Sequence, residues 1–373
     1  MQLADMGARV IKIERPGAGD DTRAWGPPFV NGESAYFLSI NRNKESVTLN
    51  FKHPDGRRLL DLLIDRADVL VENFRPGTLE EMGLGYKMVH TRHPRLIYTS
   101  ISGFGHTGPL RERAGYDAVL QAEAGIMSVT GPADGPGYKV GVAIADLAAG
   151  LFAAQGTLVA LYERERSGQG QHVDIAMLDS VAALLTYQAG IYFTTGAPPQ
   201  RLGNAHPTVA PYETFRAADG DIVLAAGNDD LWRRFCRVAG LEAYVDDPRF
   251  ATNSNRVRNY AVLRPIVAVA FLQRTRAEWI ELLNEAGIPA GPVRNLHEVL
   301  TDEQLLAREM VHTLPHAVAG SVQVLGTPVK LSTTPGAVRC APPALGEHTE
   351  QVLLGDLGLA AADVAALRAA GVV

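Results

Sequence analysis

The sequence predicts an α/β fold in which helices cover a parallel sheet, followed by a smaller α+β domain. Apolar runs rich in β-branched residues alternate with helical stretches. The runs span residues 10–13, 47–49, 69–71 and 96–101, and the helical stretches include 56–67 and 86–91. This rhythm is typical of parallel sheets, because parallel strands need a crossover connection between them. A chain of 373 residues exceeds the usual size of one hydrophobic core, so two domains are expected.

The longest helix is expected over residues 147–163, LAAGLFAAQGTLVALYE, where Ala, Gly and Leu dominate and a polar turn follows. Gln155 and Thr157 interrupt its apolar run, so the pattern indicates a core helix rather than a membrane span. Residues 172–176 then predict a further strand, and a second helix is expected over residues 178–192.

The composition changes at residues 195–207, where a Gly- and Pro-rich segment is typical of a linker. Beyond it, residues 212–226 predict a β-hairpin with an Asp-Gly turn. Three helices are expected to complete this part, over residues 231–240, 263–273 and 276–286. We therefore expect a large α/β domain at 1–195, a linker at 196–204, a small α+β domain at 205–310, and a return segment at 311–373 whose C-terminal helices pack on the large domain.

The composition excludes several classes of protein. Hydrophobic residues make up 46% and charged residues 20% of the chain, as in ordinary globular proteins. A net charge of −6 provides no basic field for a phosphate backbone, so no nucleic acid partner is expected. Only Cys236 and Cys340 occur, without metal-binding spacing, so we expect a reducing compartment, the cytoplasm, with no disulfide and no structural zinc. Since the longest apolar run predicts a core helix, no membrane partner is expected.

Two short motifs are weak indications of a site. Residues 103–108 match GxGxxG after a strand, but Pro109 and a polar run follow where a dinucleotide-binding helix would begin, so a loop is expected. His312 and His316 are spaced four apart, but Pro315 between them argues against a shared helix face, so we expect a loop pair. The motifs HExxH and GxSxG are absent, which disfavours metal-dependent and serine hydrolysis.

Four basic residues lie near strand ends, where an open α/β sheet binds phosphorylated ligands. They are Arg15, Arg42, Lys44 and Lys52. Taken one at a time, each is expected to be a solvated surface residue.

Asp146 stands where the apolar run at 141–145 meets the long helix. Aspartate is a favoured helix N-cap, because its oxygen accepts free backbone N–H groups and the helix dipole stabilises its charge. On position alone, capping is the favoured role. An isolated carboxylate in such apolar surroundings is also suited to be a reagent, and the two roles are compatible.

Taken in order, several segments resemble the class III CoA-transferases, the family that includes formyl-CoA transferase and the carnitine CoA-transferases. The resemblance rests on residues 5–16, 41–44, 71–77, 102–109, 115–117, 168–174 and 346–349, together with Asp146. It covers nearly the whole chain. It implies a Rossmann-like large domain and an interlocked homodimer.

The resemblance implies that Asp146 is the catalytic nucleophile. Its carboxylate would attack an acyl-CoA thioester to give an aspartyl anhydride, and an aspartyl-CoA thioester would follow. Such covalent catalysis divides one difficult transfer into easier steps. Coenzyme A thioester is then a substrate, and no permanently bound cofactor and no metal are expected.

The resemblance also implies the residues that line the site. Those expected at CoA are Arg15, Leu49, Lys52, Asn73, Phe74 and Met82, and those expected near the acyl group are Trp25, Tyr36 and Tyr116. Glu81 and Ala114 depart from the family pattern, since basic residues stand at these positions in related enzymes. Contacts with the CoA phosphates are therefore expected from other residues, such as Arg75 or Arg113.

The same fold hosts α-methylacyl-CoA racemases, which use the histidine of a Gly-His-Asp motif as a base. Here the motif is Gly115-Tyr116-Asp117, and a tyrosine with an ordinary pKa of about 10 is a poor base at neutral pH. Transfer is therefore expected, with the isomerase as the alternative. Segments 19–30 and 201–212 look most like the succinate–hydroxymethylglutarate (glutarate) branch, which implies a succinyl-CoA-like donor and a dicarboxylic acceptor.

Members of the family normally start with a strand and a Gly-Pro loop ahead of the segment that matches Met1. That loop helps to enclose CoA and the acyl group. This sequence lacks that strand and loop, so its site could be incomplete. A third hypothesis is therefore a catalytically silent CoA-binding protein.

Overall fold

The computed structural model describes every residue from Met1 to Val373, and the chain forms two compact units. The first unit is made of residues 1–114, 147–177 and 297–373, and the second of residues 115–146 and 178–296. These boundaries differ from the domains expected at 1–195 and 205–310. One reason is that the expected linker is bonded to the segment around residue 135, since Arg201 Nη2 donates to the carbonyl oxygen of Gly135 (2.7 Å).

Parallel strands form the centre of the first unit. Strand β1 (Val10–Glu14) pairs with β4 (Lys44–Thr48), while β6 (Ile97–Ser102) pairs with β5 (Val69–Glu72) on one side and with β7 (His172–Ala176) on the other. All three pairings are parallel, as predicted, but the strands form two separate sheets, β1–β4 and β5–β6–β7, rather than the single sheet expected. The loops that follow β1, β4, β5 and β6 therefore leave the carboxyl ends of parallel strands, where α/β sheets bind ligands.

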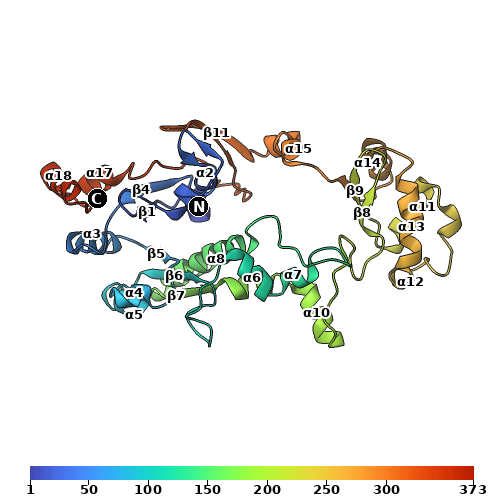
Figure 1. Ribbon diagram of the computed structural model, residues 1–373, viewed down its shortest axis with the longest axis horizontal. Coiled ribbons are helices and arrows are strands. Elements are labelled where there is room, and N and C mark those ends of the chain that lie inside the picture. The colour runs from blue at the N-terminus through green and yellow to red at the C-terminus, as the bar shows by residue number, and fades with distance from the viewer. The chain divides into compact units, whose positions relative to one another are not determined.

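Helices and two antiparallel hairpins complete the first unit (Figure 1). The helices are α1 (Gln2–Asp5), α2 (Ala35–Ile40), α3 (Pro54–Ile64), α4 (Thr78–Glu81), α5 (Tyr86–Arg92), α15 (Leu296–Leu300), α16 (Glu303–Ala307), α17 (Thr349–Gln351), α18 (Ala361–Ala369), a 3-10 turn at Asp21–Ala24 and a π-helical turn at Val352–Asp356. The hairpins are β2 (Phe29–Val30) with β3 (Glu33–Ser34), and β11 (Val311–His316) with β12 (Gly320–Leu325). The C-terminal helices pack on α3, because Leu353 and Val364 share one buried cluster with Leu59.

Helix α8 (Ile144–Ser167) packs on β6 and β7 through its small residues (Figure 1). Its buried side chains are Ala145, Ala148, Ala149, Ala153, Thr157 and Ala160. Thr157 Oγ1 lies 2.8 Å from Thr99 Oγ1 of β6, so the buried hydroxyls satisfy each other. At Gly156 an added Cβ would lie 2.7 Å from Val173 Cγ1 of β7, so the absence of a side chain lets the helix approach the sheet.

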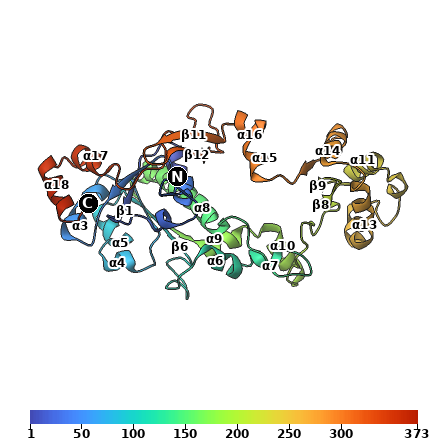
Figure 2. The ribbon, with the colours of Figure 1, turned by 45° about the horizontal axis from the view of Figure 1, so that its top comes forward.

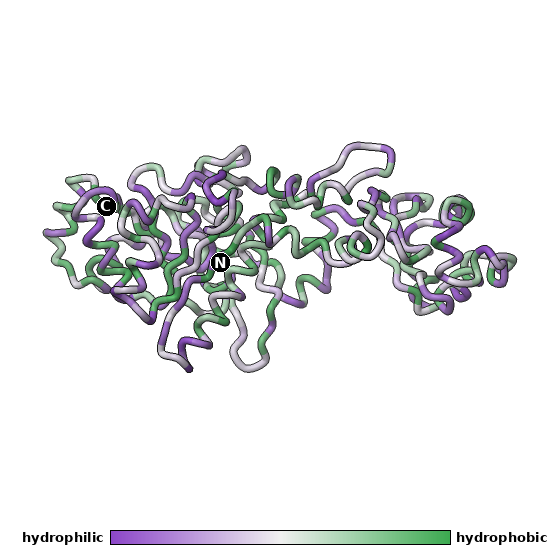
Figure 3. The backbone as a smooth tube through the Cα atoms, turned by 90° about the horizontal axis from the view of Figure 1, so that it is seen from below, coloured by the Kyte–Doolittle hydropathy of each residue, from purple (hydrophilic) through white to green (hydrophobic).

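By length and composition alone, α8 is also the one helix apolar enough to cross a membrane. Its contacts with Thr99 and Val173 instead agree with the core helix expected from the sequence. Hydrophobic and hydrophilic stretches alternate along the backbone tube in Figure 3, in keeping with the composition of the chain.

The expectations about the pair His312 and His316 and about Arg42 were wrong. His312 and His316 lie on strand β11 rather than in a loop, because a hairpin with β12 tolerates Pro315 on a strand that pairs on one side only. Arg42 is not a solvated surface residue: it is 2% exposed, and its Nη2 lies 2.7 Å from Oδ2 of the fully buried Asp5.

The second unit contains its own sheet and hydrophobic core (Figures 1 and 2). Its helices are α6 (Asp117–Glu123), α7 (Ile126–Val129), α9 (Met177–Ala183), α10 (Thr186–Thr195), α11 (Asp229–Ala239), α12 (Asn253–Arg258), α13 (Tyr260–Phe271), α14 (Arg276–Glu285) and a 3-10 turn at Glu242–Tyr244. The strands β8 (Tyr212–Arg216), β9 (Asp221–Ala225) and β10 (Ala290–Pro292) form an antiparallel sheet in the order β10–β9–β8. The predicted hairpin at 212–226 and the predicted helices after it are thus confirmed.

Aromatic residues fill the core of the second unit. The rings of Phe215 and Phe271 stack with centroids 5.0 Å apart, and Trp232 and Trp279 are fully buried beside them. The single helix expected over 178–192 is instead two helices, α9 and α10, and the chain turns at Thr186, whose φ is 36°.

Candidate active site

Asp146 is the third residue of α8, because the helix begins at Ile144. The expectation that Asp146 is the N-cap of this helix was therefore wrong. Ile144 and Ala145 are accommodated in the first turn, and the capping acceptor comes from α6: Asp117 Oδ1 accepts a hydrogen bond from the backbone N–H of Ala145 at 2.8 Å. The carboxylate of Asp146 has no hydrogen bond or ion pair to another residue of the protein, and Asp146 is exposed to solvent.

The surroundings of Asp146 raise the pKa of its carboxyl above the usual aspartate range. Partial desolvation by neighbouring atoms is the larger cause, although Asp146 as a whole is exposed, and the negative charge of Asp117 is the second. The group also lies in the first turn of a 24-residue helix, where backbone N–H groups and the helix dipole stabilise negative charge. A carboxylate with no hydrogen-bond partner at such a position is suited to nucleophilic attack, and the same N–H groups are suited to stabilise an oxyanion.

Tyr116 immediately precedes α6 and belongs to the same unit as Asp146 and Asp117. Its side chain is 75% exposed, so it is open to a ligand.

The residues expected at CoA lie in the first unit, most of them just after a strand. Arg15 follows β1, Lys52 follows β4 by four residues, and Asn73 with Phe74 follow β5. The rings of Phe51 and Phe74 meet edge to face with centroids 6.4 Å apart, so the loops after β4 and β5 lie side by side. Lys52, Asn73 and Phe74 are all exposed there, which gives an aromatic ring, an amide and a cation on one surface.

Three of the expected CoA residues have other contacts. The guanidinium of Arg15 pairs with Asp21 at 2.5 Å and remains 64% exposed. Met82 caps α4 and packs against a buried cluster. Leu49 is 1% exposed in the core below β4, so contact between Leu49 and a ligand would have to use its main-chain atoms.

Trp25 and Tyr36, both expected near the acyl group, contact each other. Their ring centroids are 4.9 Å apart in an edge-to-face arrangement, and both rings are about half exposed. The sequence predicted these two residues separately, and the structure brings them together.

The candidate phosphate contacts lie near the loop after β6. Arg75 Nη2 donates to the carbonyl oxygen of Glu112 at 2.9 Å, and the guanidinium of Arg113 lies 5.2 Å from the centroid of the Phe104 ring. Glu81 and Ala114, the two departures from the family pattern, are both exposed.

The GxGxxG segment is a loop, as predicted, and side chains hold it in place. Ser102 Oγ accepts from the N–H of Gly105 at 3.0 Å, and the carboxylate of Asp174 on β7 accepts from the N–H of His106 at 3.0 Å. These contacts tie the loop to the carboxyl end of β6 and to the middle of β7.

Glu72 is a residue that sequence reasoning missed. It is the last residue of β5 and is 8% exposed, and its carboxylate accepts from the N–H of Phe74 at 2.8 Å. Burial raises the pKa of this carboxyl above the usual glutamate range. The one signal available in the sequence was its place, at the end of an apolar strand directly before Asn73 and Phe74.

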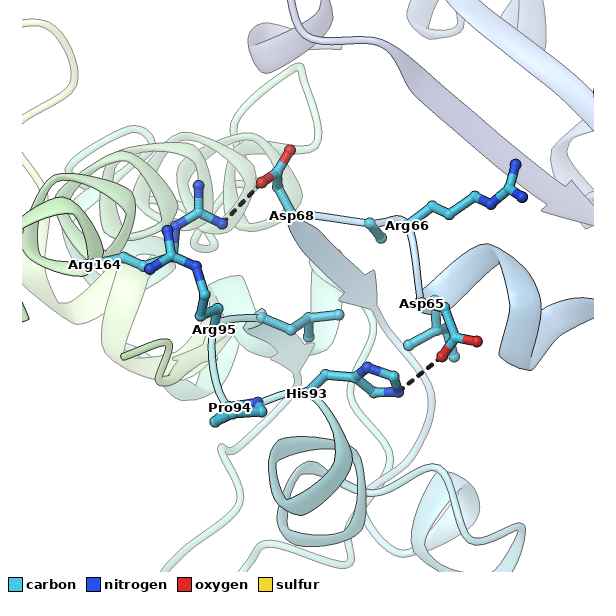
Figure 4. A pocket seen from close by; sticks show the side chains of 10 residues that line it. Asp65, Arg66, Asp68, His93, Pro94, Arg95 and Arg164 are labelled. Carbon is cyan, nitrogen blue, oxygen red and sulfur yellow. Dashed lines mark hydrogen bonds and ion pairs between the residues drawn. The ribbon is translucent and has the colours of Figure 1, made fainter. Parts of the chain in front are cut away.

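A separate pocket of about 380 Å³ lies at the opposite ends of the strands (Figure 4). Two pairs of its side chains point toward one another: Arg164 Nη1 donates to Asp68 at 2.9 Å, and His93 Nε2 lies 3.3 Å from Asp65. Asp68 directly precedes β5, so this pocket is at the amino ends of the strands. Ligands of α/β sheets bind at the carboxyl ends, so this pocket is not the candidate CoA site.

No group of three or more His, Cys, Asp or Glu side chains in the chain is arranged to hold a metal ion.

Comparison with known proteins places these features among CoA-transferases. The family model described as CoA-transferase family III matches residues 1–349. The chain is 44% identical to a mouse protein named succinyl-CoA:glutarate CoA-transferase, over 95% of this chain and 81% of that protein. It is 43% identical to the succinate–glutarate CoA-transferase of Agrobacterium fabrum, over 94% of this chain and 89% of that protein. A CAIB/BAIF family protein from Brucella suis has a similar structure, with a TM-score of 0.83, 42% identity, and coverage of 94% of this chain and 92% of that one.

Proposed function

Because the chain belongs to CoA-transferase family III and is a CoA-transferase, we propose that it works through a covalent intermediate on Asp146. The observation that carries this proposal is the carboxylate of Asp146, which has no hydrogen-bond partner in the first turn of α8. A nucleophile must keep its attacking oxygen free, and an acidic side chain that capped its own helix would not.

The proposed route exchanges carboxylate and thiolate twice. An oxygen of Asp146 attacks the thioester carbonyl of the donor and expels CoA thiolate, which leaves a mixed anhydride. The thiolate attacks the aspartyl carbonyl of this anhydride, releases the donor as its free acid, and forms an aspartyl-CoA thioester. The acceptor carboxylate displaces the thiolate to form a second anhydride. The thiolate then attacks the acceptor carbonyl and leaves Asp146 as a free carboxylate.

Isotope labelling tests this route directly. When the acceptor carboxylate carries ¹⁸O, one labelled oxygen ends in Asp146, because that oxygen bridges the second anhydride. Mass spectrometry of the peptide that contains Asp146 should show a gain of about 2 Da, as the isotope mass difference requires. Asp146→Asn should reduce the transfer rate by at least about 10³-fold, since it removes the nucleophile. Full activity of Asp146→Asn, or turnover without label in the peptide, would exclude this mechanism.

For the substrates, we propose succinyl-CoA or a close analogue as donor and a dicarboxylic acid as acceptor. The proposal rests on the names of the relatives at 43% and 44% identity. In an assay with succinyl-CoA, glutarate and other dicarboxylic acids should give kcat/KM values at least about tenfold above formate, a monocarboxylic acid, which corresponds to about 1.4 kcal/mol in the transition state. Equal values for formate would contradict the dicarboxylate preference.

We further propose that the protein works in the cytoplasm as an interlocked homodimer. Helix α8 exposes large apolar side chains on the side away from the sheet: Leu147, Leu151, Phe152, Leu158, Val159 and Tyr162. An exposed apolar strip of this size is typical of a protein interface, and a second copy is its proposed partner. Val159→Glu should shift the mass measured by light scattering from dimer to monomer. A monomeric wild-type protein would refute the assignment.

A further inference from the structure

Two side chains of helix α6 hold the backbone that leads into α8. Gln121 Oε1 accepts a hydrogen bond from the N–H of Val140 at 2.8 Å, and its Nε2 lies 3.4 Å from the carbonyl oxygen of Val142. The same Nε2 donates to Asp117 Oδ2 at 2.7 Å, and Asp117 Oδ1 accepts from the N–H of Ala145 at 2.8 Å. One connected network therefore joins α6 to three points of residues 140–145.

The network is protected from water at its centre. Gln121 and Ala145 are fully buried, whereas Gly141 and Val142 between the contact points are exposed. Residues 136–143 belong to no helix or strand, so backbone hydrogen bonds of regular structure do not fix them. Since buried polar groups are costly to leave unpaired, the side chains of Asp117 and Gln121 determine how this segment enters α8.

The hydrogen bond between Asp117 and Ala145 also affects whether Asp146 takes part in helix capping. The first backbone N–H groups of a helix need acceptors, and an aspartate in the first turn competes to supply one. Asp117 already satisfies the N–H of Ala145, so the carboxylate next to it in sequence is not drawn into capping. The charge of Asp117 also acts on Asp146 without a hydrogen bond between them.

We propose that Asp117 and Gln121 are positioning residues that fix the start of α8 and keep the carboxylate of Asp146 free for attack. The inference rests on the proposed role of Asp146 as nucleophile. It assigns a task to the aspartate of the Gly115-Tyr116-Asp117 motif and to Gln121, one helical turn further along α6.

A reversal of the hydrogen-bond polarity tests the pair without removing either side chain. In Asp117→Asn, the new amide NH₂ group faces the NH₂ group of Gln121, so two donors meet. In Gln121→Glu, the new carboxylate faces the carboxylate of Asp117, so two acceptors meet. In the double variant Asp117→Asn/Gln121→Glu, the amide at 117 still accepts from Ala145 and donates to the carboxylate at 121, which still accepts from Val140; only the longer 3.4 Å contact with the carbonyl oxygen of Val142 is lost. Each single variant should lower kcat at least about tenfold while KM for succinyl-CoA changes less than about threefold. The double variant should recover to within about threefold of the wild-type kcat.

Hydrogen exchange supplies a readout that does not depend on catalysis. The amides of Val140 and Ala145 should be protected in the wild type and in the double variant, and should exchange faster in both single variants. Asp134→Asn is the matched control, since it removes an exposed carboxylate from the adjoining loop, and it should leave kcat and exchange unchanged. Circular dichroism establishes that each variant is folded.

The outcomes separate this inference from the proposed mechanism. Wild-type kcat in both single variants, or a double variant as slow as the slower single one, would overturn the positioning role even when ¹⁸O enters Asp146. Absence of ¹⁸O from the wild-type peptide that contains Asp146 would instead overturn the proposed role of Asp146 as nucleophile, whatever the kcat values of the variants. Recovery of both kcat and amide protection in the double variant supports the assignment.

Discussion

Arg256 is expected to be the most sensitive single residue for the stability of the second unit. It is fully buried, and its guanidinium donates four hydrogen bonds. Nε donates to the carbonyl oxygen of Ala210 (2.6 Å), Nη1 to that of Phe250 (2.9 Å), and Nη2 to both the carbonyl oxygen of Gly227 (3.0 Å) and Oδ1 of Asp229 (3.0 Å). These acceptors belong to separate segments around the hairpin β8–β9, so one side chain joins all of them.

Arg256→Met keeps much of the buried volume but removes every donor. Three carbonyl groups lose a charged partner, and unpaired buried groups cost about 1–3 kcal/mol each. Asp229 is 40% exposed, so water can replace its lost partner. Methionine also recovers some apolar burial. We therefore expect the free energy of unfolding to fall by about 3–4 kcal/mol, within the range found when one partner of a buried pair is removed.

Denaturant unfolding followed by tryptophan fluorescence measures this effect, because Trp232 and Trp279 are both fully buried in the same core. Arg249→Met is the matched control: this guanidinium is 53% exposed and pairs with Asp247 at 2.7 Å, so the loss should stay below about 1 kcal/mol. Equal losses in the two variants would refute the reasoning, since the guanidinium of Arg256 would then not be more important than an exposed one.

Two further predictions concern the first unit. Phe74→Ala should raise KM for acyl-CoA by about tenfold in a steady-state assay, with little change in kcat. The reason is that a base stacked on an aromatic ring loses about 1–3 kcal/mol of binding energy when the ring is removed. A change in kcat alone would contradict a binding role. Asp20 is partly buried, but hydrogen bonds from Lys12 and Thr22 outweigh burial and lower its pKa to about 2. Asp20 therefore stabilises the fold above about pH 4, and this stability is lost as pH falls towards 2, an effect of about 1 kcal/mol after solvent screening. Urea unfolding of Asp20→Asn between pH 2 and 5 should lack this part of the pH dependence, and an unchanged profile would contradict it.

Several strands and helices were predictable because their pattern is local, whereas the hairpins β2–β3 and β11–β12 were not predicted. The alternation of apolar residues locates β1 and β7 to within a residue, and the hairpin β8–β9 follows from its Asp-Gly turn. The break between α9 and α10 was missed, since residues 178–192 carry neither Gly nor Pro before position 190 and the turn at Thr186 has no signal in composition.

The candidate site was predictable only as a set of separate residues. Because Phe74 follows a strand in the sequence, its place at the carboxyl edge of the sheet could be predicted. Its contact with Phe51 could not, because that contact depends on how the loops after β4 and β5 meet. Arg42 was expected at the surface because arginine is rarely buried, and only its partner Asp5, 37 residues away, makes burial tolerable. Long-range partners of this kind leave no periodic mark in a single sequence.

The capping error at Asp146 carries the same lesson into the mechanism. We expected Asp146 to cap the helix because an acidic residue stands directly before an apolar run. This rule assumes that the free N–H groups of the first turn are bonded by residues of the same segment. Here α8 starts at Ile144, three residues before the expected start at 147, and the acceptor comes from Asp117, which is 28 residues away from Ala145. A cap supplied from outside the helix leaves the positive end of the helix dipole in place and the side chain at its third position unbonded. The field at the start of α8 is therefore available to the oxyanion that develops on the thioester oxygen when Asp146 attacks.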